Sequence, residues 1–338
     1  MIIYKNFNIK HINSFKVNYK CHYYVIIENR NDLLELYKKN VFSKSKFIFI
    51  GGGTNILFKN DYEGIIFTIN IKGISYKYDN NDIILNINGG EIWNDIVELS
   101  IKNKYYGIEN LIMIPGRVSA APVQNIGAYG TSLEDVLINV EVFDLNYGIF
   151  TYIDSNKCCF GYRESIFKQK KYINRYIIIS INIKLSKVPK ININYPAIIE
   201  YLNKYKIYNP TINDIGDIIS YIRSYKLPDI NYFGNAGSFF KNPIVTYHKY
   251  LLLKKINNSI KGIKLLNNYY KIPAYQLIEL CGWKNKKINN IGLWHNHSLV
   301  IVNYNNGNGQ DIYNFAKKIY KSVYNKFNIK LCQEVHII

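Results

Sequence analysis

The sequence contains no long apolar run. Residues 1–6, MIIYKN, lack the apolar stretch of a secretory signal. No later segment approaches the ~20 consecutive apolar residues that a membrane-spanning helix needs. We therefore expect a soluble, cytoplasmic protein without a membrane partner.

Cysteine is scarce and unpatterned. The five cysteines are an odd number and have neither the spacing of a disulfide framework nor that of a metal site. Free thiols in a reducing compartment fit best. His295 and His297 are close enough to suggest a metal ligand pair, but no carboxylate or cysteine ligand lies near them, so we expect no metal.

Negative charge is in short supply, with 24 acidic against 43 basic residues and a formal charge of +19. Such a balance raises the possibility of an anionic partner. The lysines are dispersed among Asn, Ile and Tyr, and the chain has no basic helix or nucleic-acid motif, so we expect no nucleic-acid partner. Drift in an AT-rich genome is our hypothesis for the lysine excess.

The remaining composition is that of a folded protein. With 48% hydrophobic and 20% charged residues, the chain has enough apolar material for a globular fold. A length of 338 residues exceeds what one core usually supports, so we expect several subdomains.

Residues 23–70 follow a strand, helix, strand, loop, strand pattern, with Asn31 and Asp32 as candidate helix caps. The loop, GGGTN at residues 51–55, frees several N–H groups to point into one concavity, which suits a pyrophosphate. Its spacing is not that of a Rossmann fingerprint, and another strand follows instead of a helix. A hairpin turn is the alternative for this loop.

A second unit begins near residue 71. The pattern predicts strands at residues 82–88, 136–145, 148–153 and 176–185, and a helix over 91–101 with Ile92, Ile96 and Leu99 on one face. Between them lies a loop at residues 114–130 that is rich in small residues and can press its backbone against a large flat ligand. A loop packed only on its own sheet is the alternative.

The last part of the chain is more helical. Helices are predicted over residues 212–226, 274–281 and 310–327, and strands over 299–303 and at the C-terminus. The expected inward faces are Ile212, Ile215, Ile218, Ile219 and Ile222 in the first helix and Ile312, Phe315, Ile319 and Val323 in the last. Before the second of these helices lies GNAGSFFKNP, residues 234–243, in which two glycines precede Ser238. This pattern either presents a reactive hydroxyl or forms a tight turn into a buried strand.

Five segments together resemble one family in order and spacing: residues 51–55, 114–130, GYR at 161–163, 234–243 and the terminal Glu334. The chain resembles the UDP-N-acetylenolpyruvoylglucosamine reductases, flavoenzymes of peptidoglycan precursor synthesis, over nearly its whole length. NIGAYG at 125–130 and GNAGSFFKNP are the specific signals.

The resemblance implies an α+β fold. It consists of a two-subdomain FAD-binding fold of the vanillyl-alcohol-oxidase type, over residues 1–70 and 71–188, and a third α+β substrate-binding domain over 189–338. It also implies FAD as cofactor, NADPH as co-substrate, a UDP-sugar substrate and a monomer.

The resemblance also assigns residues. It implies that Ser238 protonates the substrate and that Arg163 and Glu334 stabilise charge on its carboxylate. The cofactor residues would be Gly51, Gly52, Gly53, Thr54, Asn55, Gly116, Ser119, Ala120, Asn125, Ile126, Gly127 and Ala128. The substrate residues would be Tyr129, Tyr195, Arg223, Lys226 and Asn242, with Tyr195 matching the tyrosine that the longer form of the family folds over the nucleotide.

The chain also departs from the family pattern. Ser119 replaces a glycine and would be strained if φ there were positive. Gln333 and His336 replace a proline and an arginine, and the WHNH segment at 294–297 is atypical. Two other readings stay open, a flavin oxidase that uses oxygen and a non-catalytic basic binding protein.

Overall fold

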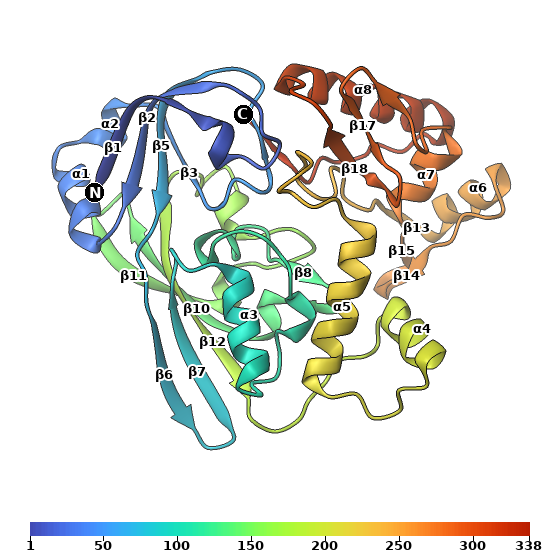
Figure 1. Ribbon diagram of the computed structural model, residues 1–338, viewed down its shortest axis with the longest axis horizontal. Coiled ribbons are helices and arrows are strands. Elements are labelled where there is room, and N and C mark those ends of the chain that lie inside the picture. Colours follow the sequence, from blue (N-terminus) through green and yellow to red (C-terminus); the bar gives the residue numbers. More distant parts are fainter. The chain divides into compact units, whose positions relative to one another are not determined.

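The computed structural model describes all residues, 1–338, and its chain forms two compact units (Figure 1). Unit 1 contains Met1–Phe7, Cys21–Gly52 and Glu63–Arg223, and unit 2 contains Asn8–Lys20, Gly53–Tyr62 and Ser224–Ile338. The division into three domains at residues 70 and 188 stays a prediction. None of the helices is both long and apolar enough to cross a bilayer.

The first part of unit 1 is built on a four-stranded sheet. Its order is β1 (Ile2–Asn8), β2 (Lys20–Ile27), β5 (Tyr62–Ile69) and β3 (Phe47–Ile50), and β3 runs parallel to β5. Helices α1 (Arg30–Lys38) and α2 (Val41–Lys44) connect β2 to β3. The order strand, helix, strand, loop, strand is confirmed.

The cap of α1 differs from the prediction. The side chain of Asn29, not that of Asn31, accepts the Asp32 N–H at 3.0 Å, and the Asp32 carboxylate accepts the N–H of Asn29 in return. This reciprocal pair satisfies two backbone donors that would otherwise lack partners. The segment offers several Asn and Asp residues in a row, so composition alone could not choose among them.

The second part of unit 1 is an antiparallel five-stranded sheet. Its order is β11 (Ile149–Asp154), β10 (Leu137–Asp144), β12 (Tyr176–Ser186), β7 (Asp82–Asn88) and β6 (Ile74–Asp79). Helices α3 (Trp93–Lys102), α4 (Pro196–Tyr205) and α5 (Ile212–Lys226) contribute buried side chains to the core on one of its faces. The predicted strands are confirmed.

The buried face of α3 was predicted incorrectly. Trp93, Ile96, Val97 and Ser100 are buried, whereas Leu99 remains partly exposed. The predicted face of α5 is right, since Ile212, Ile215, Ile218, Ile219 and Ile222 are all buried. Gly216 lets α5 approach α3, because a Cβ there would lie 2.9 Å from the Cδ1 atom of Ile101.

A β-bulge in β12 separates two cores. Ser180 pairs with Glu141 of β10, but Ile178 pairs with Val142, so Ile179 is an extra residue. Ile177 and Ile179 belong to the core that contains α1 and the four-stranded sheet, while Ile181 and Ile183 belong to the core that contains α3 and α5. The bulge shifts the alternation of the strand and allows one sheet to serve both cores.

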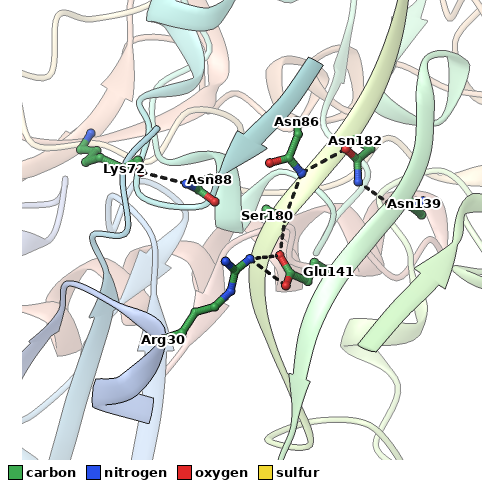
Figure 2. A network of polar contacts seen from close by, with 8 residues as sticks. All are labelled: Arg30, Lys72, Asn86, Asn88, Asn139, Glu141, Ser180 and Asn182. Carbon is green, nitrogen blue, oxygen red and sulfur yellow. Dashed lines mark hydrogen bonds and ion pairs between the residues drawn. The ribbon is translucent and has the colours of Figure 1, made fainter. Parts of the chain in front are cut away.

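Glu141 is the centre of a polar network beside the bulge (Figure 2). It is 4% exposed, and its carboxylate accepts from Arg30 Nη2 at 2.8 and 2.5 Å and from Ser180 Oγ at 2.7 Å. Asn86, Asn182 and Asn139 extend the network across three strands. A buried carboxylate requires such partners, so the network ties α1 to the five-stranded sheet.

Unit 2 has a three-stranded sheet, β16 (Lys287–Ile288), β17 (Ile291–Trp294) and β18 (His297–Asn303), with α7 (Ala274–Leu280) and α8 (Gly309–Phe327). The predictions for β18, α7 and α8 are confirmed. The C-terminal strand β19 (His336–Ile337) runs parallel to β4 (Ile56–Leu57).

A small subdomain of unit 2 was not predicted. Helix α6 (Tyr247–Ile256) packs beside a sheet in the order β13 (Ile244–Thr246), β15 (Tyr269–Lys271), β14 (Ile263–Lys264).

The short remaining elements are β8 (Gly127–Ala128), β9 (Thr131–Ser132) and the 3-10 turns η1 (Ile9–Ile12), η2 (Glu109–Leu111), η3 (Val118–Ala120), η4 (Leu133–Asp135), η5 (Ser155–Lys157), η6 (Ile166–Lys168) and η7 (Leu266–Asn268).

Glu141→Gln should lower the free energy of unfolding by about 1 to 3 kcal/mol, because Arg30 and Ser180 lose a charged acceptor in a buried position. Urea unfolding followed by circular dichroism measures the change. Glu63→Gln, at an exposed position on β5, is the control and should change stability little. Equal stability of the two variants would show that the Glu141 network does not hold α1 to the sheet.

Candidate active site

The glycine turn at residues 51–53 requires glycine because the backbone is approached closely. In unit 1, a Cβ on Gly51 would lie 2.7 Å from the Cβ of Ala120. In unit 2, Gly53 has φ +63° and its carbonyl accepts the N–H of Ser14 at 3.0 Å. Strands β3 and β4 pair with β5 and β19 and not with each other, so the alternative of a hairpin turn is wrong.

The loop at residues 114–130 is anchored to the five-stranded sheet through η3. The Ser119 N–H donates to Gly89 O at 3.0 Å, and the Val118 N–H donates to Glu91 O at 2.9 Å. Gly89 has no room for a side chain, because a Cβ would lie 2.9 Å from both the Ile179 oxygen and the Ser119 Cβ. The bulge at Ile179 therefore fixes where this loop lies.

Two of the predicted cofactor segments meet in unit 1. A Cβ on Gly51 would lie 2.7 Å from the Ala120 Cβ, so the first part of the glycine turn lies against η3. Ser119 does not have the positive φ expected from the family pattern. Gly116 has the left-handed backbone instead, with φ +119°. Backbone lined by glycine allows a dinucleotide to come close to the N–H groups of the chain.

Residues 125–128 form the far end of the loop. Asn125, with φ +46°, donates to Gly161 O at 3.3 Å and accepts the N–H of Glu134 at 3.1 Å. Gly127 and Ala128 form β8, and Ile126 is 8% exposed. The segment next to residues 161–163 is therefore rigid.

A cluster of two tyrosines and two arginines lies in unit 1. The Arg163 Nη2 donates to Gly127 O at 2.8 Å, and the ring of Tyr129 lies 5.1 Å from that of Tyr195. Tyr129 and Arg163 both interact electrostatically with Arg223. Four side chains that the sequence predicted as site residues, from four separate segments, are thus brought together.

Arg223 in this cluster has the Tyr129 hydroxyl as a side-chain partner and no carboxylate. Its Nη2 donates to Met113 O at 3.1 Å, but its Nε is buried and has no hydrogen-bond partner. Burial lowers the pKa of the Arg223 guanidinium, and the positive charge of Arg163 also lowers it. Burial likewise raises the pKa of Tyr129. A buried cation that shares its surroundings with a second cation is stabilised by an anion.

In unit 2, the serine segment is held from both sides. The Phe239 N–H donates to Leu299 O at 2.8 Å, and the Phe239 carbonyl accepts the N–H of Glu334 at 2.9 Å. Ser238 is half-buried, and its hydroxyl forms no hydrogen bond within the chain. The hydroxyl is therefore fixed by its backbone and available to a substrate.

The two glycines before Ser238 have different tasks. Gly234 lies against the Phe15 carbonyl, where a side chain would collide with backbone. Gly237 has φ +64° and open space around it, so only its conformation requires glycine. Asn235 accepts the Gly237 N–H at 3.1 Å and donates to Phe233 O at 2.9 Å, which holds the turn.

Glu334 and Asn55 lie together in unit 2. Asn55 Nδ2 donates to the Glu334 carbonyl at 3.2 Å, and the Asn55 carbonyl accepts the N–H of His336 at 3.0 Å. The Glu334 N–H reaches Phe239, next to Ser238. Among the other predicted residues of this unit, Asn242 Oδ1 accepts the Ala274 N–H at 2.8 Å and so caps α7.

His297, to which no role was assigned from the sequence, lies close to Lys226. Burial lowers the pKa of His297 to about 4, and the positive charge of Lys226 adds to the effect. The Tyr275 ring lies 6.2 Å from the imidazole, and Glu279 is engaged by Ser298 Oγ at 2.7 Å. The described residues contain no group of three or more His, Cys, Asp or Glu that could hold a metal.

Other contributors were missed because they act through backbone. Gly89 admits η3, whereas Gly90 lies against the backbone of Asn70 and Ile71. Arg117 Nη1 donates to Gly90 O at 2.6 Å and to Asn70 Oδ1 at 3.0 Å. The Gly89–Gly90 pair directly after a predicted strand was the only available signal. Nothing in the sequence indicates the bulge.

Comparisons with known proteins cover the whole chain. A sequence model of the FAD binding domain matches residues 21–150, and one of the UDP-N-acetylenolpyruvoylglucosamine reductase C-terminal domain matches residues 228–338. The UDP-N-acetylenolpyruvoylglucosamine reductases of Amoebophilus asiaticus and Flavobacterium johnsoniae are 39% and 37% identical over 100% of both chains. The crystal structure of the Thermus caldophilus enzyme superimposes with a TM-score of 0.68 at 18% identity, covering 99% of this chain and 98% of that one.

These matches define, first, an FAD-dependent oxidoreductase with an FAD-binding fold of mixed α and β content, followed by a C-terminal domain. More specifically, the chain belongs to the UDP-N-acetylenolpyruvoylglucosamine reductase family. Its activity is the FAD-dependent, NADPH-driven reduction of UDP-N-acetylglucosamine enolpyruvate in peptidoglycan precursor synthesis. The readings as a flavin oxidase or a non-catalytic binding protein give way to this membership.

The lowered pKa of His297 predicts a pH-dependent stability. Above pH ~6.5 the imidazole is neutral in both states and contributes no pH dependence. As the pH falls from ~6.5 to about 4, the unfolded chain binds a proton that the folded chain does not, so stability falls, by up to about 3 kcal/mol. His297→Gln should lose less stability over this window in urea unfolding. Parallel pH profiles would contradict the assignment.

Proposed function

We propose that the residues of this chain divide the reduction as follows. Ser238 donates a proton to the enolpyruvyl group, and Arg163 and Glu334 stabilise the charge that develops on its carboxylate. The observation that carries the proposal is the cluster of Arg163, Arg223, Tyr129 and Tyr195, in which the buried Nε of Arg223 has no partner in the chain. Two adjacent cations with tyrosine hydroxyls match an anionic, sugar-linked substrate.

The residues present fit FAD. Gly51 and Gly116 let a ligand approach the backbone closely, because a side chain at Gly51 would collide and φ at Gly116 is positive. We assign the pyrophosphate to Gly51, Gly52, Gly53, Thr54 and Asn55, and the flavin to the loop that contains Gly116, Ser119, Ala120, Asn125, Ile126, Gly127 and Ala128. When bound and reduced by NADPH, FAD supplies the hydride that the substrate accepts.

Ser238 suits the role of proton donor because of how it is held. Hydride addition to a carbon–carbon double bond leaves negative charge beside the carboxylate, and that charge is discharged by a proton from a positioned acid. The Ser238 hydroxyl has no competing partner in the chain, and the next residue, Phe239, is bonded through its backbone on both sides. No acceptor within the chain therefore competes with the substrate for the Ser238 proton.

Arg163 and Glu334 are proposed to act on the carboxylate. The Arg163 guanidinium is oriented by its bond to Gly127 O, and a guanidinium can donate to an oxyanion through several N–H groups. The backbone of Glu334 is fixed on both sides, by Phe239 and by Asn55, which limits the positions of its side chain. Groups that are already oriented stabilise developing charge without reorganisation.

The UDP part of the substrate is assigned to Tyr129, Tyr195, Arg223, Lys226 and Asn242. Arg223 is suited to a phosphate because a guanidinium donates through several N–H groups in one plane. Tyr195 is 37% exposed and precedes the first turn of α4, so its ring can turn over a bound nucleotide. We further propose a cytoplasmic monomer that has no nucleic-acid partner.

Ser238→Ala should leave flavin reduction by NADPH intact and slow reoxidation by UDP-N-acetylglucosamine enolpyruvate by ~10² to 10⁴ fold, because the positioned proton is lost. Anaerobic stopped-flow absorbance separates the two half-reactions. Wild-type reoxidation in this variant would remove Ser238 from the mechanism.

A pair of glycine variants provides the matched control for that experiment. Gly237 and Gly282 both have positive φ and open space at the Cβ position, so alanine at either should cost about 1 to 2 kcal/mol of stability. Only Gly237→Ala should also slow reoxidation, because only Gly237 orients Ser238. Equal reoxidation rates in the two variants would show that the turn does not position the hydroxyl.

Arg223→Gln should weaken binding of the enolpyruvyl substrate by ~10 to 100 fold, since a charge-assisted hydrogen bond contributes about 1.5 to 3 kcal/mol. Isothermal titration calorimetry measures the dissociation constant. Arg223→Lys should recover only part of the affinity, because lysine keeps the positive charge but lacks the planar set of N–H donors of a guanidinium. Lys204→Gln, an exposed site on α4, should bind normally, and an equal loss there would indicate a general charge effect.

A further inference from the structure

Acidic residues are nearly absent from a long segment of unit 2. Between residues 230 and 310 the only acid is Glu279, against ten lysines. Glu279 is engaged by Ser298 Oγ at 2.7 Å. Unit 2 also contains no arginine. This segment contains α6 and the β13–β15 sheet, at the margin of unit 2 (Figure 1).

Helix α6 is anchored on one side only. Leu253 is fully buried, Tyr250 stacks on Tyr270 of β15 with ring centroids 4.4 Å apart, and Lys249 Nζ donates to Phe327 O at 2.8 Å. These contacts fix which side of α6 faces outward.

The outward side of α6 is apolar and basic. Leu251, Leu252 and Ile256 are 41%, 38% and 48% exposed. Helical spacing puts Leu251 and Lys255 in one row and His248, Leu252 and Ile256 in the adjacent row. We call these five residues the α6 outer face. Aliphatic side chains exposed side by side mark an interaction site.

The tip of the neighbouring hairpin has the same character. Leu266, in the turn between β14 and β15, is 88% exposed, and Lys261 and Lys264 next to it are exposed as well. Aliphatic side chains surrounded by lysine, without acids, form the pattern of a helix that lies in a membrane interface.

We propose that the α6 outer face docks this enzyme on an anionic lipid bilayer. The aliphatic residues enter the boundary between head groups and acyl chains, and the surrounding lysines contact lipid phosphates. Nucleic acid fits less well, because its binding sites favour arginine and stacking aromatics over exposed leucine and isoleucine. A second copy of the chain would bring like charges together.

This inference revises one expectation drawn from the sequence. We expected no membrane partner because no segment can span a bilayer, and none of the helices does. Surface attachment needs only one amphipathic face and positive charge, and neither is visible in a search for long apolar runs.

Flotation with vesicles tests the proposal on the full-length enzyme. The chain should float with vesicles of phosphatidylglycerol and phosphatidylethanolamine and remain unbound with vesicles of phosphatidylcholine alone. Leu251→Asn/Leu252→Asn should abolish flotation, and Lys255→Gln should weaken binding about fivefold, the effect of one lysine at an anionic surface. The control Ile199→Asn removes an exposed aliphatic residue on α4 of unit 1 and should float normally.

Folding of each variant is checked by its flavin spectrum and circular dichroism. The proposal is overturned if the wild-type chain does not float, if it floats equally on phosphatidylcholine, or if the double variant floats like wild type. It is also overturned if duplex DNA displaces the chain from the vesicles and binds the double variant as tightly as wild type, because the surface would then be a nucleic-acid site.

Discussion

One extra residue in one strand determines how unit 1 is organised. Without the bulge at Ile179, the alternation of β12 would run unbroken, and its side chains after residue 180 would point to the opposite faces. The bulge lets Ile177 and Ile179 enter one core and Ile181 and Ile183 the other. It also directs the Ile179 carbonyl at Gly89, whose N–H donates to it at 2.6 Å. The loop that holds the predicted flavin residues is therefore positioned by the same irregularity that joins the two cores.

The cluster of Arg163, Arg223, Tyr129 and Tyr195 lowers the stability of the protein alone, in contrast to the bulge, which supports the fold. A buried guanidinium with an unpartnered Nε, beside a second guanidinium, is unfavourable in the protein alone. Arg30 and Arg175, in contrast, each pair with a buried carboxylate. Arg223 instead has Tyr129 and the Met113 carbonyl as partners and no carboxylate, which agrees with our proposal that the substrate supplies the anion. Strain of this kind concentrates at functional sites.

The sequence was informative where periodicity or spacing was strong. The inward faces of α5 and α8 follow directly from the spacing of their apolar residues, and the structure matches both. The helix α6 was missed because it has exposed apolar residues as well as buried ones, so its sequence shows no single apolar stripe. The bulge leaves no sequence signal, since it depends on the register between two strands. The joining of Tyr129, Arg163, Tyr195 and Arg223 was predicted only through family resemblance, because their segments are far apart along the chain.

The basic charge also has a different meaning once the structure is known. Drift toward lysine in an AT-rich genome would act on the whole chain and would raise lysine everywhere. It does not account for a segment of unit 2 that keeps an ordinary share of lysines and yet has one acid in residues 230–310. Residues 165–199 also contain no acid, so the low acid content is not confined to this segment. What requires a local cause is the set of exposed leucines among lysines on a helix whose other side is firmly packed. An anionic surface is such a cause, because every carboxylate placed there would oppose the contact.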